Sequence, residues 1–286
     1  MATPIPPSAR KEKSVLLDVK DASKTFRGRR GSEPVLAVRN ANLTARPGEF
    51  NAIVGESGSG KSTLARMLLD LIPVTSGSIE LDGVSLSAMT GAQRKVFRRS
   101  VQAVLQDPAG SLNPRKTVRR TIGEIVRLHD MARGRTDTAA KVAEALELVG
   151  LIPADAFLDR YPHELSGGQR QRVLIARAIV LDPQIIVADE AVSALDASVK
   201  AGVLRLMNDL KERLGVGYVF ITHDLPVVKK VADYVYVMKA GEIVEHGTKD
   251  EIFANAQHPY TRELLAASPI LDLARIVPTA AASELR

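Results

Sequence analysis

Residues 55–63 read GESGSGKST and combine three glycines with one lysine and several hydroxyl side chains. They match the pattern G-x-x-x-x-G-K-[ST], in which the backbone N–H groups of a glycine-rich turn surround the phosphates of a nucleotide. In this pattern Lys61 reaches the β- and γ-phosphates, and the hydroxyl of Ser62 can bind Mg²⁺. A flexible glycine-serine turn is the alternative. The predicted nucleotide-binding residues are Gly55, Glu56, Ser57, Gly58, Ser59, Gly60, Lys61, Ser62 and Thr63.

Two carboxylates follow a second apolar run, IIVADE, at residues 185–190. Asp189 and Glu190 lie at the carboxyl end of a predicted buried strand, where open α/β sheets bind their ligands. Asp189 fits the acidic partner of Mg²⁺, and Glu190 fits a general base or a group that orients water. An acidic pair at a helix N-terminus would look the same, but the phosphate loop elsewhere in the chain favours the functional interpretation.

A second helix start that could bind an anion is predicted at LSGGQ, residues 165–169. Ser166 is a typical N-cap residue, and Gly167 and Gly168 follow it at the first turn of a helix. A simple kinase or GTPase needs only one such site, so the pair of sites favours another class of enzyme. A helix cap with glycines for close packing is the alternative explanation.

The elements that position these motifs alternate between strands and helices. Predicted strands are short apolar runs, and they cover 15–20, 35–45, 50–55, 101–106, 184–190 and 217–223. Predicted helices have apolar residues at helical spacing, and they cover 62–72, 166–181 and 197–215. Hairpins are expected at Asp82-Gly83 and around Gly241. This alternation predicts an α/β fold with a mostly parallel sheet and helices on its faces.

The pattern changes between Asp107 and Leu165, where two amphipathic helices, 118–132 and 137–151, follow each other with no strand between them. This indicates a helical lobe inserted into the α/β core. The predicted division of the chain is a disordered arm at 1–13, a core at 14–106 and 166–269, a helical lobe at 107–165 and a loosely held tail at 270–286.

Composition narrows the function classes. The 286 residues are 45% apolar and 25% charged, as in ordinary folded proteins. The absence of cysteine excludes disulfides, thiolate metal sites and iron–sulfur clusters. No apolar run approaches the roughly 18 residues that span a bilayer, and prolines interrupt the start, MATPIPPSARKEK, so a cytoplasmic protein is expected. The net charge is +6, but the densest basic cluster, QRKVFRRS near Arg98 and Arg99, lacks the interleaved aromatic residues of a nucleic-acid stacking surface. No nucleic-acid partner is therefore expected.

The phosphate loop, LSGGQ, IIVADE, SALD and ITHD occur in the order and spacing that resemble the ATP-binding subunits of ABC transporters. The resemblance implies a P-loop NTPase cassette, in which a mostly parallel sheet core carries an antiparallel β part and an inserted helical lobe, with ATP and Mg²⁺ as cofactors. It implies that Phe26 stacks on adenine and that Gln106 contacts Mg²⁺ and catalytic water. His223 would contact the γ-phosphate as a catalytic group. The residues implied to contact the nucleotide of a facing cassette are Ser166, Gly167, Gly168, Gln169 and Asp196.

A narrower resemblance, to the peptide and nickel importer branch, is carried by DPAGSLNPRKTV at 107–118, DEAVSALD at 189–196 and HPYTRELLAA at 258–267. Many members of that branch have a cysteine-bearing tail, which this cysteine-free chain lacks. The resemblance implies a motor subunit at the cytoplasmic face of the inner membrane. Its implied partners are two membrane permease subunits, an extracytoplasmic solute-binding protein and a second ATPase subunit, which is a related chain or a copy of itself.

Two other classes remain as alternatives, a soluble ABC ATPase that acts on ribosomes or nucleic acid and an exporter ATPase. The first usually carries two cassettes or a long coiled-coil insertion, and the SLNPR and HPYT stretches argue against the second. The solute stays open among peptides, nickel and opine-like compounds, because the residues that select it belong to other subunits.

Overall fold

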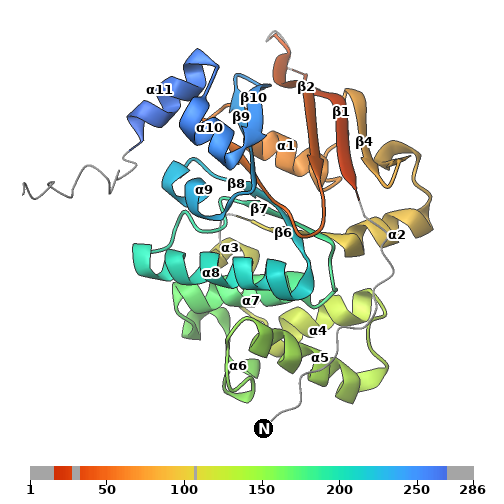
Figure 1. The fold of residues 1–286 in the computed structure, drawn as a ribbon. Helices are drawn as coiled ribbons and strands as arrows, with labels where there is room; N and C mark the ends of the chain where they lie inside the picture. The colour runs from red at the N-terminus through yellow and green to blue at the C-terminus, as the bar shows by residue number, and fades with distance from the viewer. Residues whose placement is uncertain (1–15, 28–32, 106–107, 269–286) are drawn as a thin grey trace, which may run out of the picture.

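The computed structural model describes residues 16–27, 33–105 and 108–268, which form two sheets and the helices around them (Figure 1). The first sheet is antiparallel, with strand order β2-β1-β4-β5. Its strands are β1 (Leu17–Phe26), β2 (Val35–Ala45), β4 (Ser76–Leu81) and β5 (Val84–Ser85). Asp82 and Gly83 join β4 to β5 with positive φ angles of 52° and 76°, which confirms the predicted hairpin.

The second sheet has six strands in the order β10-β9-β3-β8-β7-β6, and only β10 runs antiparallel to its neighbour. Its strands are β3 (Phe50–Val54), β6 (Val101–Val104), β7 (Ile185–Asp189), β8 (Gly217–Ile221), β9 (Tyr234–Lys239) and β10 (Glu242–Thr248). All residues of β3, β7 and β8 are buried, as their continuous apolar runs predict for central parallel strands.

Side-chain alternation gives the second sheet two different faces. On β7, Ile186 and Ala188 pack against α7 (Gly167–Ile179) and α8 (Ala197–Leu214), whereas Ile185 and Val187 join the cluster that contains α1 (Lys61–Leu68) and the first sheet. The strand β8 alternates in the same way. The helices α1 and α7 therefore lie on opposite faces of the sheet.

Residues 108–165 form helices joined by turns and loops, with no strand among them. The helices are α3 (Pro108–Ser111), α4 (Val118–Leu128), α5 (Gly134–Leu148) and α6 (Asp155–Leu158), with a 3-10 turn at Pro162–Glu164. Ile122 and Val126 of α4 and Val142 and Leu146 of α5 are fully buried and belong to the cluster beneath α7. The boundaries of a separate lobe at 107–165 stay a prediction. The arm at 1–13 and the tail at 270–286 lie outside the described residues.

Several helices differ from the sequence prediction. The helix expected at 62–72 ends at Leu68, because Asp70 takes a left-handed conformation with φ 55° and its carboxylate is bound by Arg94. Among the described residues, the sequence analysis also did not identify the short helices α3 and α6 or the 3-10 turns at Leu86–Ala88 and Pro162–Glu164. Outside the helical segment it missed α2 (Gly91–Ser100), α9 (Leu225–Val231), α10 (Lys249–Asn255) and α11 (Pro259–Ala267).

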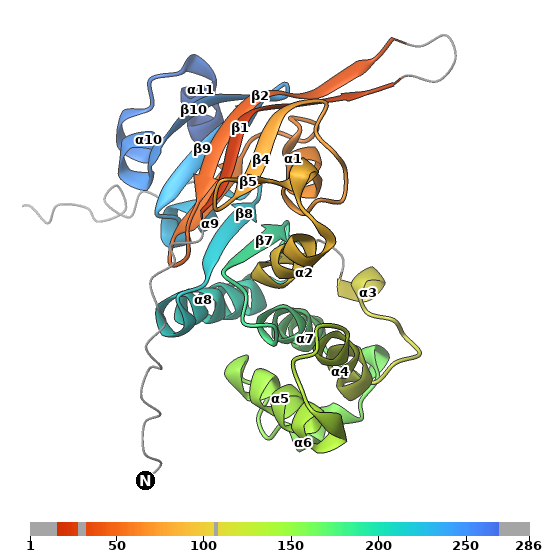
Figure 2. The ribbon, with the colours of Figure 1, turned by 90° about the vertical axis from the view of Figure 1, so that its right-hand side faces the viewer.

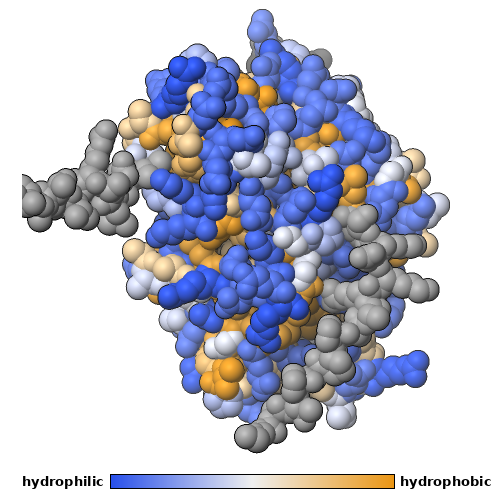
Figure 3. Space-filling model, in the orientation of Figure 1, coloured by the Kyte–Doolittle hydropathy of each residue, from blue (hydrophilic) through white to orange (hydrophobic). Residues whose placement is uncertain are grey.

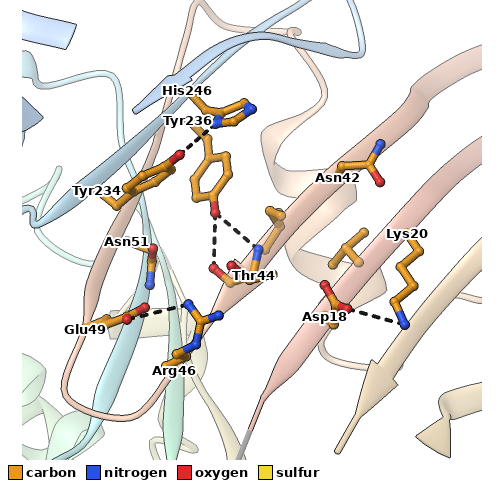
Figure 4. Close-up of a pocket in the computed structure, with 12 residues that line it drawn as sticks. Asp18, Lys20, Asn42, Thr44, Arg46, Glu49, Asn51, Tyr234, Tyr236 and His246 are labelled. Atoms are coloured by element: carbon orange, nitrogen blue, oxygen red, sulfur yellow. Dashed lines mark hydrogen bonds and ion pairs between the residues drawn. The ribbon is translucent and has the colours of Figure 1, made fainter. Parts of the chain in front are cut away.

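The two sheets are also joined by a polar contact at the edge of the core between them. Tyr236 of β9 donates its hydroxyl hydrogen to the Thr44 carbonyl oxygen and accepts the Thr44 N–H, both at 3.2 Å (Figure 4). Tyr234 bonds His246 beside it, with 2.7 Å between the hydroxyl and Nδ1. These contacts tie β9 and β10 of the second sheet to β2 of the first.

The surface is mostly polar on the face that Figure 3 shows, where hydrophilic side chains separate small apolar areas. Among the described residues, the most exposed large aliphatic side chains are those of Leu128, Ile152, Val35, Val96 and Leu71. They come from different parts of the chain, as scattered surface apolar residues usually do.

We expect Phe50→Ala to lower the free energy of unfolding by about 3–5 kcal/mol, because it empties a packed site. The Phe50 side chain is fully buried, and its ring centroid lies 4.9 Å from that of Tyr218 and 5.5 Å from that of Phe220. Urea unfolding followed by circular dichroism measures the change. Val96→Ala on α2, where the side chain is 61% exposed, is the control and should change stability by less than about 0.5 kcal/mol. Equal losses in both variants would contradict the packing argument.

Candidate functional site

The phosphate loop connects β3 to α1 at residues 55–60. Gly55 and Gly60 adopt φ angles of 151° and 103°, which side chains with a Cβ rarely take. A Cβ on Gly60 would lie 2.4 Å from the Ala37 carbonyl oxygen, and one on Gly55 would lie 2.1 Å from the carbonyl oxygen of Met238. Both conformation and space therefore require glycine at the two ends of the loop.

Lys61 is turned into this loop. Its ammonium group donates hydrogen bonds to the carbonyl oxygens of Gly55 at 2.7 Å and Glu56 at 2.6 Å, and to Ser59 Oγ at 3.2 Å. The residue is only 6% exposed, and burial lowers the pKa of Lys61, while the nearby carboxylates, Glu190 first, act against that shift. A phosphate group placed over the loop would be a charged acceptor for this buried ammonium.

The two predicted carboxylates face different neighbours. Ser62 Oγ donates to Asp189 Oδ1 at 3.3 Å, and burial raises the pKa of Asp189. Glu190 has a positive φ of 48°, and its N–H donates to the Ile221 carbonyl oxygen at 2.9 Å. Its Oε1 lies 3.3 Å from Nδ1 of His223, whose side chain is mostly exposed. One carboxylate therefore faces the phosphate loop, and the other contacts the predicted catalytic histidine.

The donor set suits Mg²⁺. A hydroxyl from Ser62 and a carboxylate from Asp189 are hard oxygen ligands, and Mg²⁺ usually takes only one or two protein carboxylates while phosphates and water complete its shell. Within the described part of the chain, no cluster of three or more His, Cys, Asp or Glu side chains could hold a metal by itself. An ion here would therefore depend on the bound phosphates for further ligands.

A cleft of about 430 Å³ opens above the phosphate loop. Its walls include Glu190 and six of the nine predicted nucleotide-binding residues, Ser57, Gly58, Gly60, Lys61, Ser62 and Thr63. Two further walls were not identified from the sequence, the start of β2 at 35–37 and the β9–β10 turn at 240–241. The hairpin predicted around Gly241 was the available signal. The turn is fixed to the loop, because the Gly241 N–H donates to the Ser59 carbonyl oxygen at 2.9 Å.

Phe26 lies next to the cleft. It pairs with Val35 at the end of the β1–β2 ribbon, which extends beyond the rest of the first sheet (Figure 2). Phe26 is 40% exposed, and the Lys24 ammonium lies 5.4 Å from the centroid of its ring, so an aromatic side chain is available beside the cleft wall. Gln106 lies outside the described residues.

The LSGGQ residues form the start of α7. Ser166 Oγ accepts the N–H of Gln169 at 3.2 Å, and Gln169 Oε1 accepts the N–H of Ser166 at 2.9 Å, which makes a complete capping box. A Cβ on Gly168 would lie 2.6 Å from Val199 Cγ1, so this glycine permits close packing against α8. Both interpretations of the glycines, a cap with close packing and an anion site, are compatible with this geometry.

The group at the start of α7 is separate from the cleft around Lys61. Residues 166–169 are not among those that line it, and α7 and α1 lie on opposite faces of the second sheet. Asp196, another predicted contact residue, is exposed and directly precedes α8. Two residues near it in the sequence lie against the glycines of α7, Leu195 beside Gly167 and Val199 beside Gly168. The structure therefore brings Asp196 together with the α7 group and not with the phosphate loop.

Comparison with protein families gives two matches. The ABC transporter family matches residues 38–193, and the oligopeptide/dipeptide transporter C-terminal region matches residues 244–284. The chain is 48% identical over 250 residues to the glutathione import ATP-binding protein GsiA of Salmonella typhi and 46% identical over 249 residues to that of Escherichia coli strain K12. Each match covers 87% of this chain and 40% of the relative, so the chain spans about 40% of the length of these curated relatives.

Solved structures give a similar result. The dimeric, post-hydrolysis ATP-binding cassette MJ0796 bound to ADP and Pi has a TM-score of 0.71 and 30% identity, covering 82% of this chain and 98% of that one. The cbiO1 protein from Clostridium perfringens, part of the ABC transporter complex cbiONQ, has a TM-score of 0.73 and 27% identity, covering 85% of this chain and 92% of that one. Both likenesses extend over more than four-fifths of this chain.

We expect Gly60→Ala to weaken nucleotide binding at least about tenfold, because the new Cβ meets a backbone oxygen and the residue keeps a strained φ. Isothermal titration with Mg-ATP measures the affinity. Gly83→Ala is the matched control, because Gly83 has a similar positive φ of 76° and open space around its Cβ position. It should lower stability but leave the affinity unchanged. Equal affinities for both variants would show that the short distance between Gly60 and the Ala37 carbonyl oxygen does not matter for nucleotide binding.

Proposed function

The chain belongs to the ABC transporter family, whose match covers more than half of its residues, and we propose that it is the ATP-hydrolysing motor subunit of an importer. The likeness to two solved cassettes confirms the predicted fold class. One observation supports ATP hydrolysis above all others. The buried Lys61, Ser62 and Glu190 line one cleft, and Ser62 donates a hydrogen bond to Asp189, although the loop and the acidic pair come from segments more than a hundred residues apart.

In the proposed reaction the phosphate loop and Lys61 bind the β- and γ-phosphates of ATP. Bound Mg²⁺, held by Ser62, Asp189 and Gln106, would neutralise charge on these phosphates. Glu190 accepts the proton of the attacking water. His223, whose Nδ1 lies 3.3 Å from Glu190 Oε1, orients the Glu190 carboxylate and contacts the γ-phosphate. Phe26 provides the stacking surface for adenine beside the cleft.

The proposed solute is a peptide or a peptide-like compound. Two observations support it, the match of residues 244–284 to the oligopeptide/dipeptide transporter C-terminal region and the names of the relatives, which are glutathione import proteins. Nickel and opine-like compounds are less favoured, because the relatives' names give them no support. The same names favour import over export and over work on ribosomes or nucleic acid.

The proposed partners are two membrane permease subunits, an extracytoplasmic solute-binding protein and a second ATPase subunit, either a related chain or a copy of this one. Within residues 16–27, 33–105 and 108–268, no helix has both the length and the apolar character needed to cross a membrane. We place the chain at the cytoplasmic face of the inner membrane, held there by the permease subunits.

Each nucleotide is proposed to be shared between two cassettes. Ser166, the N–H groups of Gly167 and Gly168, and Gln169 would contact the γ-phosphate bound at Lys61 of the facing chain, with Asp196 beside them. The support is geometric, because the α7 group lies apart from the chain's own cleft. The first N–H groups of a helix have no acceptor within the helix and suit an anion, and the MJ0796 cassette forms a dimer.

We expect Glu190→Gln to keep ATP binding and to reduce hydrolysis by about 10²–10⁴-fold, because the amide fits the same space but accepts no proton. Phosphate release under saturating Mg-ATP measures hydrolysis, and an ATP-bound dimer should accumulate on a sizing column. Glu212→Gln, at an exposed site on α8, is the control and should hydrolyse ATP normally. Near-normal turnover in the Glu190 variant would assign the water to another group.

The sharing of sites predicts complementation. Ser166→Arg should leave ATP binding at Lys61 of the same chain intact, and Lys61→Ala should abolish it, while each variant alone should be inactive. In a mixed dimer one composite site carries both substitutions and the other carries none, so hydrolysis should return to at most about half of the wild-type rate. ATPase assays on mixtures with verified mixed dimers test this. If they stay inactive, a cross-link from position 166 to nucleotide on the opposite chain decides between coupled sites and a wrong arrangement.

A further inference from the structure

A side chain of α11, far from the phosphate loop in the sequence, forms a hydrogen bond with that loop. The hydroxyl of Tyr260, on α11, accepts the backbone N–H of Glu56 at 3.1 Å, although the two residues are 204 positions apart. Tyr260 is only 3% exposed, and its ring belongs to the apolar cluster that contains Val54, the last residue of β3. A residue of the matched C-terminal region thus reaches the loop that is predicted to bind phosphate.

This contact fixes the plane of one particular peptide bond. The carbonyl oxygen of Gly55 and the N–H of Glu56 belong to the same trans peptide, so they point in opposite directions. The oxygen accepts a hydrogen bond from Lys61 at 2.7 Å, while the N–H donates to Tyr260. The first peptide of the loop is therefore held at both ends, with its oxygen toward the buried ammonium. Rotating it would withdraw an acceptor from Lys61 and leave the N–H of Glu56 without its partner.

Tyr260 is itself held from several sides. The Lys239 ammonium lies 4.3 Å from the centroid of its ring, and the Tyr260 N–H donates to Nδ1 of His258 at 3.2 Å. The Glu245 carboxylate of β10 accepts the N–H of Gln257 at 2.6 Å and that of His258 at 3.1 Å. The start of α11 is thus fixed to the β9–β10 hairpin, so the phenol cannot follow a displaced loop without breaking these contacts. Burial raises the pKa of Tyr260, and the hydroxyl keeps its proton.

The same hairpin contacts the loop a second time. Gly241, in the β9–β10 turn, donates its N–H to the Ser59 carbonyl oxygen at 2.9 Å. The loop is thus held near both of its ends. The Tyr260 side chain of α11 holds the Glu56 N–H, and the backbone of the hairpin holds the Ser59 carbonyl oxygen. Only the first of these contacts depends on a side chain and can be removed by substitution.

We infer that Tyr260 is a positioning residue of the nucleotide site, whose hydroxyl holds the Gly55–Glu56 peptide in the orientation that Lys61 and a bound phosphate require. The segment 244–267 thereby sets the affinity of the site for nucleotide. This inference rests on the proposed binding of ATP. A purely structural role, in which the hydroxyl only anchors α11, would change stability and leave nucleotide affinity as it is.

The test compares Tyr260→Phe with Tyr236→Phe in the whole chain. Each substitution removes one buried hydroxyl that bonds to backbone and keeps the ring, and the two tyrosines are 3% and 5% exposed. Tyr236 contacts Thr44 and does not line the cleft around Lys61. Titration with Mg-ATP gives the dissociation constant, thermal unfolding gives stability, and amide exchange by NMR reports on the N–H of Glu56.

We expect Tyr260→Phe to raise the dissociation constant for Mg-ATP about three- to tenfold, the range for one lost hydrogen bond, and to speed exchange of the Glu56 amide at least about tenfold. Both substitutions should lower the melting temperature by similar amounts. Tyr236→Phe should change neither the dissociation constant for Mg-ATP nor the exchange rate of the Glu56 amide. Wild-type affinity in Tyr260→Phe, with the melting temperature lowered as in the control, would overturn the inference.

Failure of the proposed function and failure of the Tyr260 contact give different results. If the unaltered chain fails to bind Mg-ATP, the proposed function is wrong. The amide exchange then still decides whether Tyr260 holds the loop. If Tyr260→Phe fails to fold, exchange in the unaltered chain decides. A Glu56 amide that is protected supports the contact, and one that exchanges as fast as a free loop amide overturns it.

Discussion

The buried positive charge of Lys61 is the constraint on which the site depends. A lysine residue that is only 6% exposed keeps its positive charge only when its ammonium group has hydrogen-bond acceptors and opposite charges nearby. The loop supplies carbonyl oxygens by closing tightly around the side chain, and that closure brings the backbone at Gly60 too near to Ala37 for any side chain. The carboxylates Asp189 and Glu190 favour the charged form from across the cleft. Loop, glycines and acidic pair thus satisfy a single electrostatic requirement.

The parallel sheet brings these groups together. The strand β8 lies between β3 and β7 in matched register, so the residues that follow all three strands meet at one edge. The N–H of Thr222 donates to the Ile53 carbonyl oxygen, and the N–H of Glu190 donates to that of Ile221, which locks the ends of the strands beside each other. The edge therefore presents the phosphate loop, Glu190 and His223 side by side.

The start of α7 and the helix that follows the phosphate loop lie on opposite faces of this sheet. Alternating side chains on β7 and β8 place α1 on one face and α7 on the other. Ser166 consequently caps a helix that belongs to the α7–α8 layer, and Lys61 begins a helix in the layer between the sheets. This geometry supports the proposal that one chain provides two halves of two different sites.

The candidate site residues could be identified from the sequence alone. The phosphate loop, the acidic pair and the α7 cap are contiguous patterns, and the central strands are continuous apolar runs, so each could be predicted without knowing its neighbours. The short helices α9, α10 and α11 have too few turns for a clear apolar period, and they were missed. The early end of α1 depends on Arg94, which lies 24 residues beyond Asp70. Only the tertiary structure decided that the β9–β10 turn and Tyr260 support the phosphate loop. The contact between Tyr260 and Glu56 joins residues 204 positions apart. Strand pairing in the sheet, which no local pattern encodes, determines that such residues meet.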